Sequence, residues 1–258
     1  MIEGLLLDID GVLTVSWEAI PGSVAALERL RADDVPFRLI TNTTTHTRRE
    51  LAQLLNAAGF ALDADDIITA VVATAGYLRA NHPGASTYVL SDGEPGADLD
   101  GVELVDAPED ADVVVLGGAS DAFTYDIINR SFRRVAGGAP LVAMHRNRYW
   151  KTQQGLELDG GAYVAALEMA TGTTAAVCGK PSPTFFHAAL DMLGLPAGSV
   201  AMVGDDIVND VLAAQAAGLT GIQVRTGKFR ESDLLQGNDK PDHVVDSLAD
   251  VPALIRER

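Results

Sequence analysis

Short apolar runs alternate with longer stretches of helical periodicity along most of the chain, and this alternation limits the possible folds more than any other feature. LLLDID at residues 5–10 is typical of a buried strand, and SVAALERLRADD at 23–34 carries Val24, Leu27 and Leu30 at helical spacing. A second strand-like run, PFRLITN, follows at 36–42. Strands that alternate with helices predict an α/β fold with a largely parallel sheet.

The alternation continues to residue 227. Further strands are expected at 67–70, 88–92, 112–118, 140–145, 175–179, 200–206 and 221–227, and helices at 48–59, 72–81, 125–138, 163–172, 183–194 and 208–218. Gly59 is typical of the residue that ends a helix.

Composition narrows the class of protein. The chain is 47% hydrophobic, enough for a sizeable core, and no apolar run reaches the roughly 18 residues of a membrane span. The net charge of −17 repels a phosphate backbone, which argues against nucleic-acid partners. The single cysteine, Cys178, excludes an intramolecular disulfide, and the N-terminus shows no leader pattern. We therefore expect a cytoplasmic protein with no membrane partner.

Polar residues follow the apolar part of several predicted strands, at the edge where parallel α/β sheets bind ligands. These residues are Asp8 and Asp10, Thr41 and Asn42, Gly179 and Lys180, and Asp205 and Asp206 with Asp210 following. Each group alone has a structural explanation as a turn, a solvated loop or a helix cap. Their joint placement favours one shared site.

The residue types at this edge predict phosphoryl chemistry. Asp8, Asp10 and Asp205 supply the hard oxygen ligands that Mg²⁺ prefers, and Lys180 offsets part of their charge. Such a cation makes an acidic protein able to accept a phosphoryl group, with the Thr41 hydroxyl as a further donor. A carboxylate can then act as the nucleophile and form an aspartyl-phosphate.

Four motifs carry a resemblance to a known family. DIDGVLT, ITN, GKP and GDDIVND resemble, in this order, the motifs of the haloacid dehalogenase (HAD) superfamily of phosphatases. The resemblance implies a Rossmann-like parallel-sheet core, the HAD fold. It also implies that Asp8 is the nucleophile, that Asp10 is the general acid/base and binds Mg²⁺ through its main-chain carbonyl, and that Asp205 is a further metal ligand.

The resemblance extends to the phosphoryl site. It implies that the phosphoryl group is bound or neutralised by Gly11, Thr41, Asn42, Thr43 and Lys180. The resemblance also implies that Asp206 or Asp210 holds metal-bound water or orients Lys180. The sequence does not show which of the two residues has this role.

A long stretch without these motifs separates ITN from GKP. The resemblance places the chain in the type IIA, NagD-like branch, with a core domain of residues 1–76 and 179–258 and an inserted α/β cap of residues 77–178. RYWKTQQGLELDGGAYVAALE and the stretch from GKPSPTFFHAAL onward resemble the group of phospholysine phosphohistidine inorganic pyrophosphate phosphatases and their HAD-domain-containing relatives. Homodimers are what this resemblance suggests.

The chain departs from its branch in two places. The animal members of that group carry serine where this chain has Asp10, and an N-x-D element of the branch is replaced by HRNRYWK. Since Asp10 can protonate an alkoxide and serine cannot, the chain is expected to favour ordinary phosphomonoesters. The candidate specificity residues of the cap are Asp121, Phe123, Arg146, Asn147, Arg148, Tyr149 and Lys151, and Thr226 and Gly227 are either site entrance or plain turn.

The expected function is therefore that of a Mg²⁺-dependent phosphatase for small phosphorylated metabolites. Hydrolysis of phosphoramidates or inorganic pyrophosphate is one alternative, and a same-fold mutase or dehalogenase is another. A non-catalytic binding protein is the alternative from a different class. The five histidines show no metal-binding spacing, so no zinc centre is expected.

Overall fold

The computed structural model describes residues 2–152, 155–235 and 239–256. The chain forms two compact units. The first unit comprises Met1–Thr41, Arg48–Ile68 and Lys180–Arg258, and the second comprises Asn42–Thr47 and Thr69–Gly179. The domain assignment from the sequence, with its core–cap boundaries at 76/77 and 178/179, stays a prediction.

The first unit is built on a six-stranded sheet in the order β15-β14-β13-β1-β4-β5. Its strands are β1 (Gly4–Asp8), β4 (Phe37–Thr41), β5 (Ile67–Thr69), β13 (Val200–Gly204), β14 (Thr220–Val224) and β15 (His243–Val245). The pairs from β15 to β4 are parallel. Every residue of β1 is buried, as expected for a central strand that is covered on both faces.

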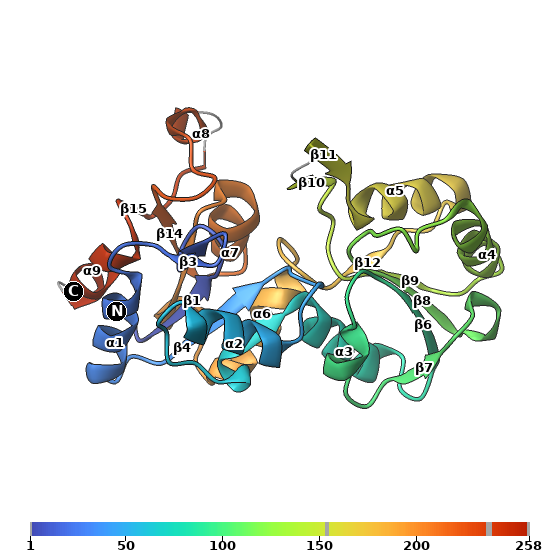
Figure 1. Ribbon diagram of the computed structural model, residues 1–258, viewed down its shortest axis with the longest axis horizontal. Helices are drawn as coiled ribbons and strands as arrows, with labels where there is room; N and C mark the ends of the chain where they lie inside the picture. Colours follow the sequence, from blue (N-terminus) through green and yellow to red (C-terminus); the bar gives the residue numbers. More distant parts are fainter. Residues whose placement is uncertain (1, 153–154, 236–238, 257–258) are drawn as a thin grey trace. The chain divides into compact units, whose positions relative to one another are not determined.

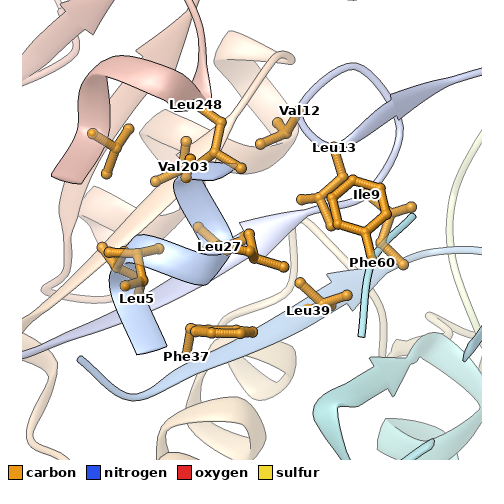
Figure 2. Packing of buried hydrophobic residues seen from close by; sticks show 14 of the residues in the cluster. Leu5, Ile9, Val12, Leu13, Leu27, Phe37, Leu39, Phe60, Val203 and Leu248 are labelled. Atoms are coloured by element: carbon orange, nitrogen blue, oxygen red, sulfur yellow. The ribbon is translucent and has the colours of Figure 1, made fainter. Parts of the chain in front are cut away.

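Helices cover both faces of this sheet (Figure 1). On one face α1 (Ser23–Ala32), α2 (Arg48–Ala57) and α9 (Val251–Arg256) share an apolar cluster with alternate strand residues. Figure 2 shows Leu5, Leu39 and Val203 from three neighbouring strands in this cluster, with Leu27 of α1 packed against them. Leu6 points to the opposite face, where α6 (Pro183–Leu193) and α7 (Ala213–Ala216) contact β4 and β14.

The second unit has a parallel five-stranded sheet in the order β12-β9-β8-β6-β7. Its strands are β6 (Ser86–Leu90), β7 (Glu103–Val105), β8 (Val113–Leu116), β9 (Leu141–Ala143) and β12 (Ala176–Val177). Figure 1 shows α4 (Tyr125–Ala136) and α5 (Gly160–Thr171) on one side of the sheet and α3 (Ala70–Asn81) on the other. Val114 and Val115 of β8 belong to separate apolar clusters, so the central strand is buried on both faces.

The α/β fold with a parallel sheet that the sequence predicts is confirmed. Several short elements were not predicted: β7, β15, the antiparallel pairs β2 (Thr14–Val15) with β3 (Glu18–Ala19) and β10 (Tyr149–Thr152) with β11 (Gly155–Leu158), and the helix α8 (Glu231–Leu235). Short 3₁₀ turns lie at η1 (Ala64–Asp66), η2 (Pro95–Asp98), η3 (Pro108–Asp110), η4 (Ala197–Ser199) and η6 (Leu248–Asp250). Within the described part of the chain, no helix is both long and apolar enough to cross a bilayer.

The helix predicted over 208–218 is not uniform. Residues Ile207–Leu212 form a π-helical turn, η5, and the α-helical geometry of α7 begins only at Ala213. The carbonyl of Asp206 accepts hydrogen bonds from the N–H groups of both Asp210 (3.0 Å) and Val211 (3.4 Å), which widens the first turn. Such π-turns are frequent at functional sites.

Cys178 provides a test of the packing in the second unit. The residue is buried, and burial raises the pKa of its thiol to about 12, with a hydrogen bond to Thr74 opposing the shift. Since only the thiolate reacts, the native protein should not react with Ellman's reagent at pH 8, whereas the unfolded protein should release one equivalent. Rapid reaction of the native protein would contradict the buried position of Cys178.

Candidate active site

A buried lysine in the first unit, Lys180, forms ion pairs with two aspartates from different elements. Asp8 ends β1, Lys180 lies just before α6, and Asp210 lies in the π-turn η5. The Nζ of Lys180 lies 2.7 Å from Oδ1 of Asp8 and 2.7 Å from Oδ1 of Asp210. The exposed fraction of the side chain is 5% for Lys180, 8% for Asp8 and 1% for Asp210. Water therefore screens these charges little, and the ion pairs fix the three groups relative to one another.

Asp205 brings a third carboxylate to this place. It follows β13, which is the sheet neighbour of β1, and carboxylate oxygens of Asp8, Asp205 and Asp210 lie within 4.8 Å of one another. Burial raises the pKa of Asp205 to about 6, and the charge of Asp210 adds to the shift. Burial likewise raises the pKa of Asp210 to about 7, although Lys180 opposes the shift. One buried ammonium does not neutralise three buried carboxylates.

The cluster fits a divalent cation. Among the described residues, Oδ1 of Asp205 is a buried carboxylate oxygen without a hydrogen-bond partner, which is costly unless another group binds it. Hard carboxylate oxygens are the ligands of Mg²⁺ in proteins, and a cation would also supply the missing positive charge. Asp8, Asp205 and Asp210 are therefore able to hold a metal ion.

Asp10 and Gly11 form the turn that follows β1. Gly11 has a φ of +83°, and a Cβ atom there would lie 2.0 Å from Oδ2 of Asp205, so only glycine fits. Asp10 is exposed, in contrast to Asp8. Partial desolvation of its carboxyl nevertheless raises the pKa of Asp10, although the charges of Lys228 and Lys180 oppose the shift. The predicted ligation through the Asp10 carbonyl stays a prediction.

Asp206 and Asp210 occupy different positions, which the sequence alone did not separate. Asp210 pairs with Lys180, as described above. The Asp206 carboxylate instead accepts hydrogen bonds from the N–H groups of Val208 (3.1 Å) and Asn209 (3.0 Å) and from the Asn209 side chain (2.8 Å). Asp206 thus caps the π-turn, whereas the Asp210 carboxylate contacts Lys180.

The predicted phosphoryl-binding residues are divided between the two units. Thr41 is buried at the end of β4, the strand that pairs with β1 in the first unit. Asn42 and Thr43 belong to the second unit, where Asn42 packs tightly against Gly179. A Cβ at Gly179 would lie 2.6 Å from Oδ1 of Asn42. The contact of these residues with a phosphoryl group stays a prediction.

The candidate specificity residues of the cap differ in how exposed they are. Phe123 is buried against Tyr163, with ring centroids 4.8 Å apart, and is therefore a core residue. Arg146 pairs with Glu168 at 2.5 Å. Asp121, Asn147, Arg148 and Tyr149 are exposed, and the side chain of Lys151 lies outside the described part of the structure.

The sequence did not indicate Gln223. This side chain is fully buried in β14, and its Nε2 donates to the carbonyls of Gly204 (3.2 Å), Asp205 (2.8 Å) and Val224 (2.9 Å). It thereby fixes the backbone that carries Asp205. The only available signal was a single amide in an otherwise apolar strand-like run, GIQV.

Two family models match the chain. A haloacid dehalogenase-like hydrolase model matches residues 5–105, and a HAD-hydrolase-like model matches residues 177–251. Haloacid dehalogenase-like hydrolase domain-containing protein 2 of Homo sapiens is 38% identical, over 93% of this chain and 90% of that protein. Phospholysine phosphohistidine inorganic pyrophosphate phosphatase of Danio rerio is 38% identical, over 100% of this chain and 96% of that protein.

Solved structures agree with these matches. The p-nitrophenyl phosphatase of Archaeoglobus fulgidus has a TM-score of 0.91 and 30% identity, with 98% of this chain and 99% of that chain covered. NagD of E. coli K-12 has a TM-score of 0.88 and 28% identity, with 96% and 98% covered. The chain belongs to the haloacid dehalogenase-like hydrolase family. The family, together with relatives that are named phosphatases, supports assignment of the chain as a phosphatase-type hydrolase.

Replacement of Gln223 tests its role in holding the Asp205 segment. Gln223→Met should lower the free energy of unfolding by about 1–3 kcal/mol, because buried carbonyls lose their donor. Urea unfolding measures the loss, and Gln53→Met at an exposed position of α2 is the matched control. Equal stability of both variants would contradict the structural role of Gln223.

Proposed function

We propose that this protein is a Mg²⁺-dependent phosphatase that hydrolyses small phosphomonoesters through an aspartyl-phosphate on Asp8. The observation that carries the proposal is the buried Lys180, which contacts Asp8 and Asp210 at 2.7 Å beside the partnerless oxygen of Asp205. A purely structural ion pair has no need of a third, uncompensated carboxylate. The arrangement suits a site that binds a cation and a phosphoryl group together.

The proposed reaction assigns the first step to Asp8 and Asp10. The Asp8 carboxylate attacks phosphorus, and an O–P bond to Asp8 forms as the bond between phosphorus and the ester oxygen breaks. Asp10 gives its proton to the leaving alkoxide. In the second step Asp10 takes a proton from water, which attacks phosphorus and releases Asp8 and inorganic phosphate.

The remaining residues position and neutralise the phosphoryl group. Lys180 holds Asp8 in place and offsets the charge of the cluster, and Asp210 orients Lys180. Mg²⁺ would be held by the carboxylates of Asp8 and Asp205 and the carbonyl of Asp10, and would neutralise charge on the phosphoryl oxygens. The phosphoryl group itself is proposed to bind Gly11, Thr41, Asn42 and Thr43.

The proposal extends to the organisation of the chain. Residues 1–76 and 179–258 are proposed as the catalytic domain, and residues 77–178 as a cap that excludes water and contacts the leaving group. The protein is proposed to act in the cytoplasm on phosphorylated metabolites, as a homodimer.

A second candidate function has its own support. The relative from Danio rerio is named for action on phospholysine, phosphohistidine and inorganic pyrophosphate, and it aligns with the whole of this chain. The same Asp8 chemistry would cleave P–N bonds and phosphoanhydrides, whose leaving groups depend less on an enzyme's general acid than an alkoxide does. A substrate screen that includes both classes separates the candidates.

Removal of the nucleophile tests the proposed reaction. Asp8→Asn should lower kcat for p-nitrophenyl phosphate by about a thousandfold or more, because the amide cannot form the intermediate. EDTA should abolish wild-type turnover, and added Mg²⁺ should restore it. Initial rates of p-nitrophenolate release measure both effects.

The matched control for this experiment is Asp191→Asn, which removes a carboxylate from an exposed position of α6. It should leave kcat unchanged. Retained turnover in the Asp8→Asn protein would contradict the assignment of Asp8 as the nucleophile.

Replacement of Asp10 tests the leaving-group argument. Asp10→Ser should slow alkyl phosphates by about 10²- to 10⁴-fold, the usual contribution of a general acid. Hydrolysis of p-nitrophenyl phosphate should fall less, because p-nitrophenolate leaves without a proton. Equal losses on both substrates would remove the argument that Asp10 directs the enzyme towards phosphomonoesters.

A further inference from the structure

The loop after β14 is tied to the site at two points. The Thr226 hydroxyl donates a hydrogen bond to the carbonyl of Gly11 at 2.5 Å. The backbone N–H of Lys228 donates to Oδ2 of Asp205 at 2.7 Å. Residues 225–228 therefore connect the turn after β1 with the carboxylate that follows β13, and all of these residues belong to the first unit.

Gly227 makes this close approach possible. Its φ is +63°, and a Cβ atom there would lie 2.1 Å from Oδ2 of Asp205 and 2.6 Å from the Cα of Gly11. No other residue fits without moving the loop or the carboxylate. The backbone of Lys228 is thereby fixed next to the cluster of Asp8, Asp205 and Asp210.

Lys228 differs from Lys180 in exposure. Lys180 is buried and bound to two carboxylates, whereas Lys228 is exposed. Desolvation alone would lower the pKa of Lys228. The negative charges of nearby carboxylates outweigh this effect, so the pKa is raised overall; the carboxylates are those of Asp205, Asp8, Asp206 and Asp210. The Lys228 charge also acts on Asp10. Lysine carries a positive charge at neutral pH, and the Lys228 backbone contacts Asp205 of the acidic cluster.

We propose that Lys228 is a substrate-binding residue, whose exposed ammonium binds the phosphoryl oxygens of the substrate at the rim of the Asp8–Asp205–Asp210 cluster. This inference rests on the proposed phosphatase function. A phosphoryl dianion that approaches the site meets several carboxylates, and Lys180 is already bound to two of them. A second cation at the rim offsets this repulsion and can form a charge-assisted contact with the substrate.

The position of Lys228 has two consequences of opposite sign. The ammonium attracts phosphate, so its removal weakens phosphate binding. It repels a second cation held by the same carboxylates, so its removal strengthens Mg²⁺ binding. A residue with a purely structural role would weaken both or change neither.

Lys228→Met separates these effects, because methionine keeps the backbone N–H that binds Asp205 and removes only the charge. Isothermal titration should show the Kd for inorganic phosphate, with Mg²⁺ present, rise about tenfold, the change expected for one charge-assisted contact. Titration with Mg²⁺ alone should show its Kd fall by about threefold. The KM for p-nitrophenyl phosphate should rise with the phosphate Kd.

Two further variants serve as controls. Lys228→Arg keeps the charge and should hold phosphate affinity within about twofold of the wild type. Lys240→Met changes the net charge equally at another exposed lysine and should leave both affinities unchanged.

The outcomes distinguish this inference from the proposed function. If the wild type hydrolyses p-nitrophenyl phosphate but Lys228→Met alters neither affinity, or weakens both, the role of Lys228 is wrong and the phosphatase assignment stands. If the wild type binds neither Mg²⁺ nor phosphate, both proposals are overturned.

Discussion

The contact of Lys180 with Asp8 and Asp210 is the interaction on which the rest of the site depends. Removing one partner of a buried ion pair costs about 3–5 kcal/mol, because the other charge is left unpaired. The register of the sheet determines where Asp8 lies, since Leu7 of β1 is opposite Val203 of β13. Asp8 therefore lies close to Asp205, which follows the neighbouring strand. The π-turn η5 then brings the Asp210 carboxylate to Lys180.

The same cluster is short of positive charge, and this imbalance determines what it can bind. The pKa values of Asp205 and Asp210 are raised to about 6 and about 7 because burial and mutual repulsion exceed the compensation from nearby lysines. Such a site favours a divalent cation. An acidic chain with a net charge of −17 otherwise repels phosphate, so attraction of an anionic substrate has to be local. The proposed Mg²⁺ ion and Lys228 would both provide it.

The sequence predicted the parts of the fold and site that follow from periodicity and strand ends. Buried strands such as β1 and β13 are nearly continuous apolar runs; Asp8 is the last residue of β1, and Asp205 is the first residue after β13. The π-turn was not predicted, because bifurcated bonding at the Asp206 carbonyl leaves no periodic signal. The sequence indicated neither Gln223 nor Lys228. Gln223 contacts Gly204 and Asp205, and the Lys228 N–H contacts Asp205, so both depend on residues that are distant in sequence. Short strands such as β7 and β15 have too few residues to show alternation.

The central claim is that Asp8 becomes phosphorylated during turnover. Borohydride reduces an aspartyl-phosphate to homoserine, which tandem mass spectrometry locates in a peptide. Wild-type protein that is quenched with borohydride during turnover of p-nitrophenyl phosphate with Mg²⁺ should carry homoserine at residue 8. Protein without substrate should not carry it. Active turnover with aspartate intact at residue 8 and homoserine at another position would contradict the account.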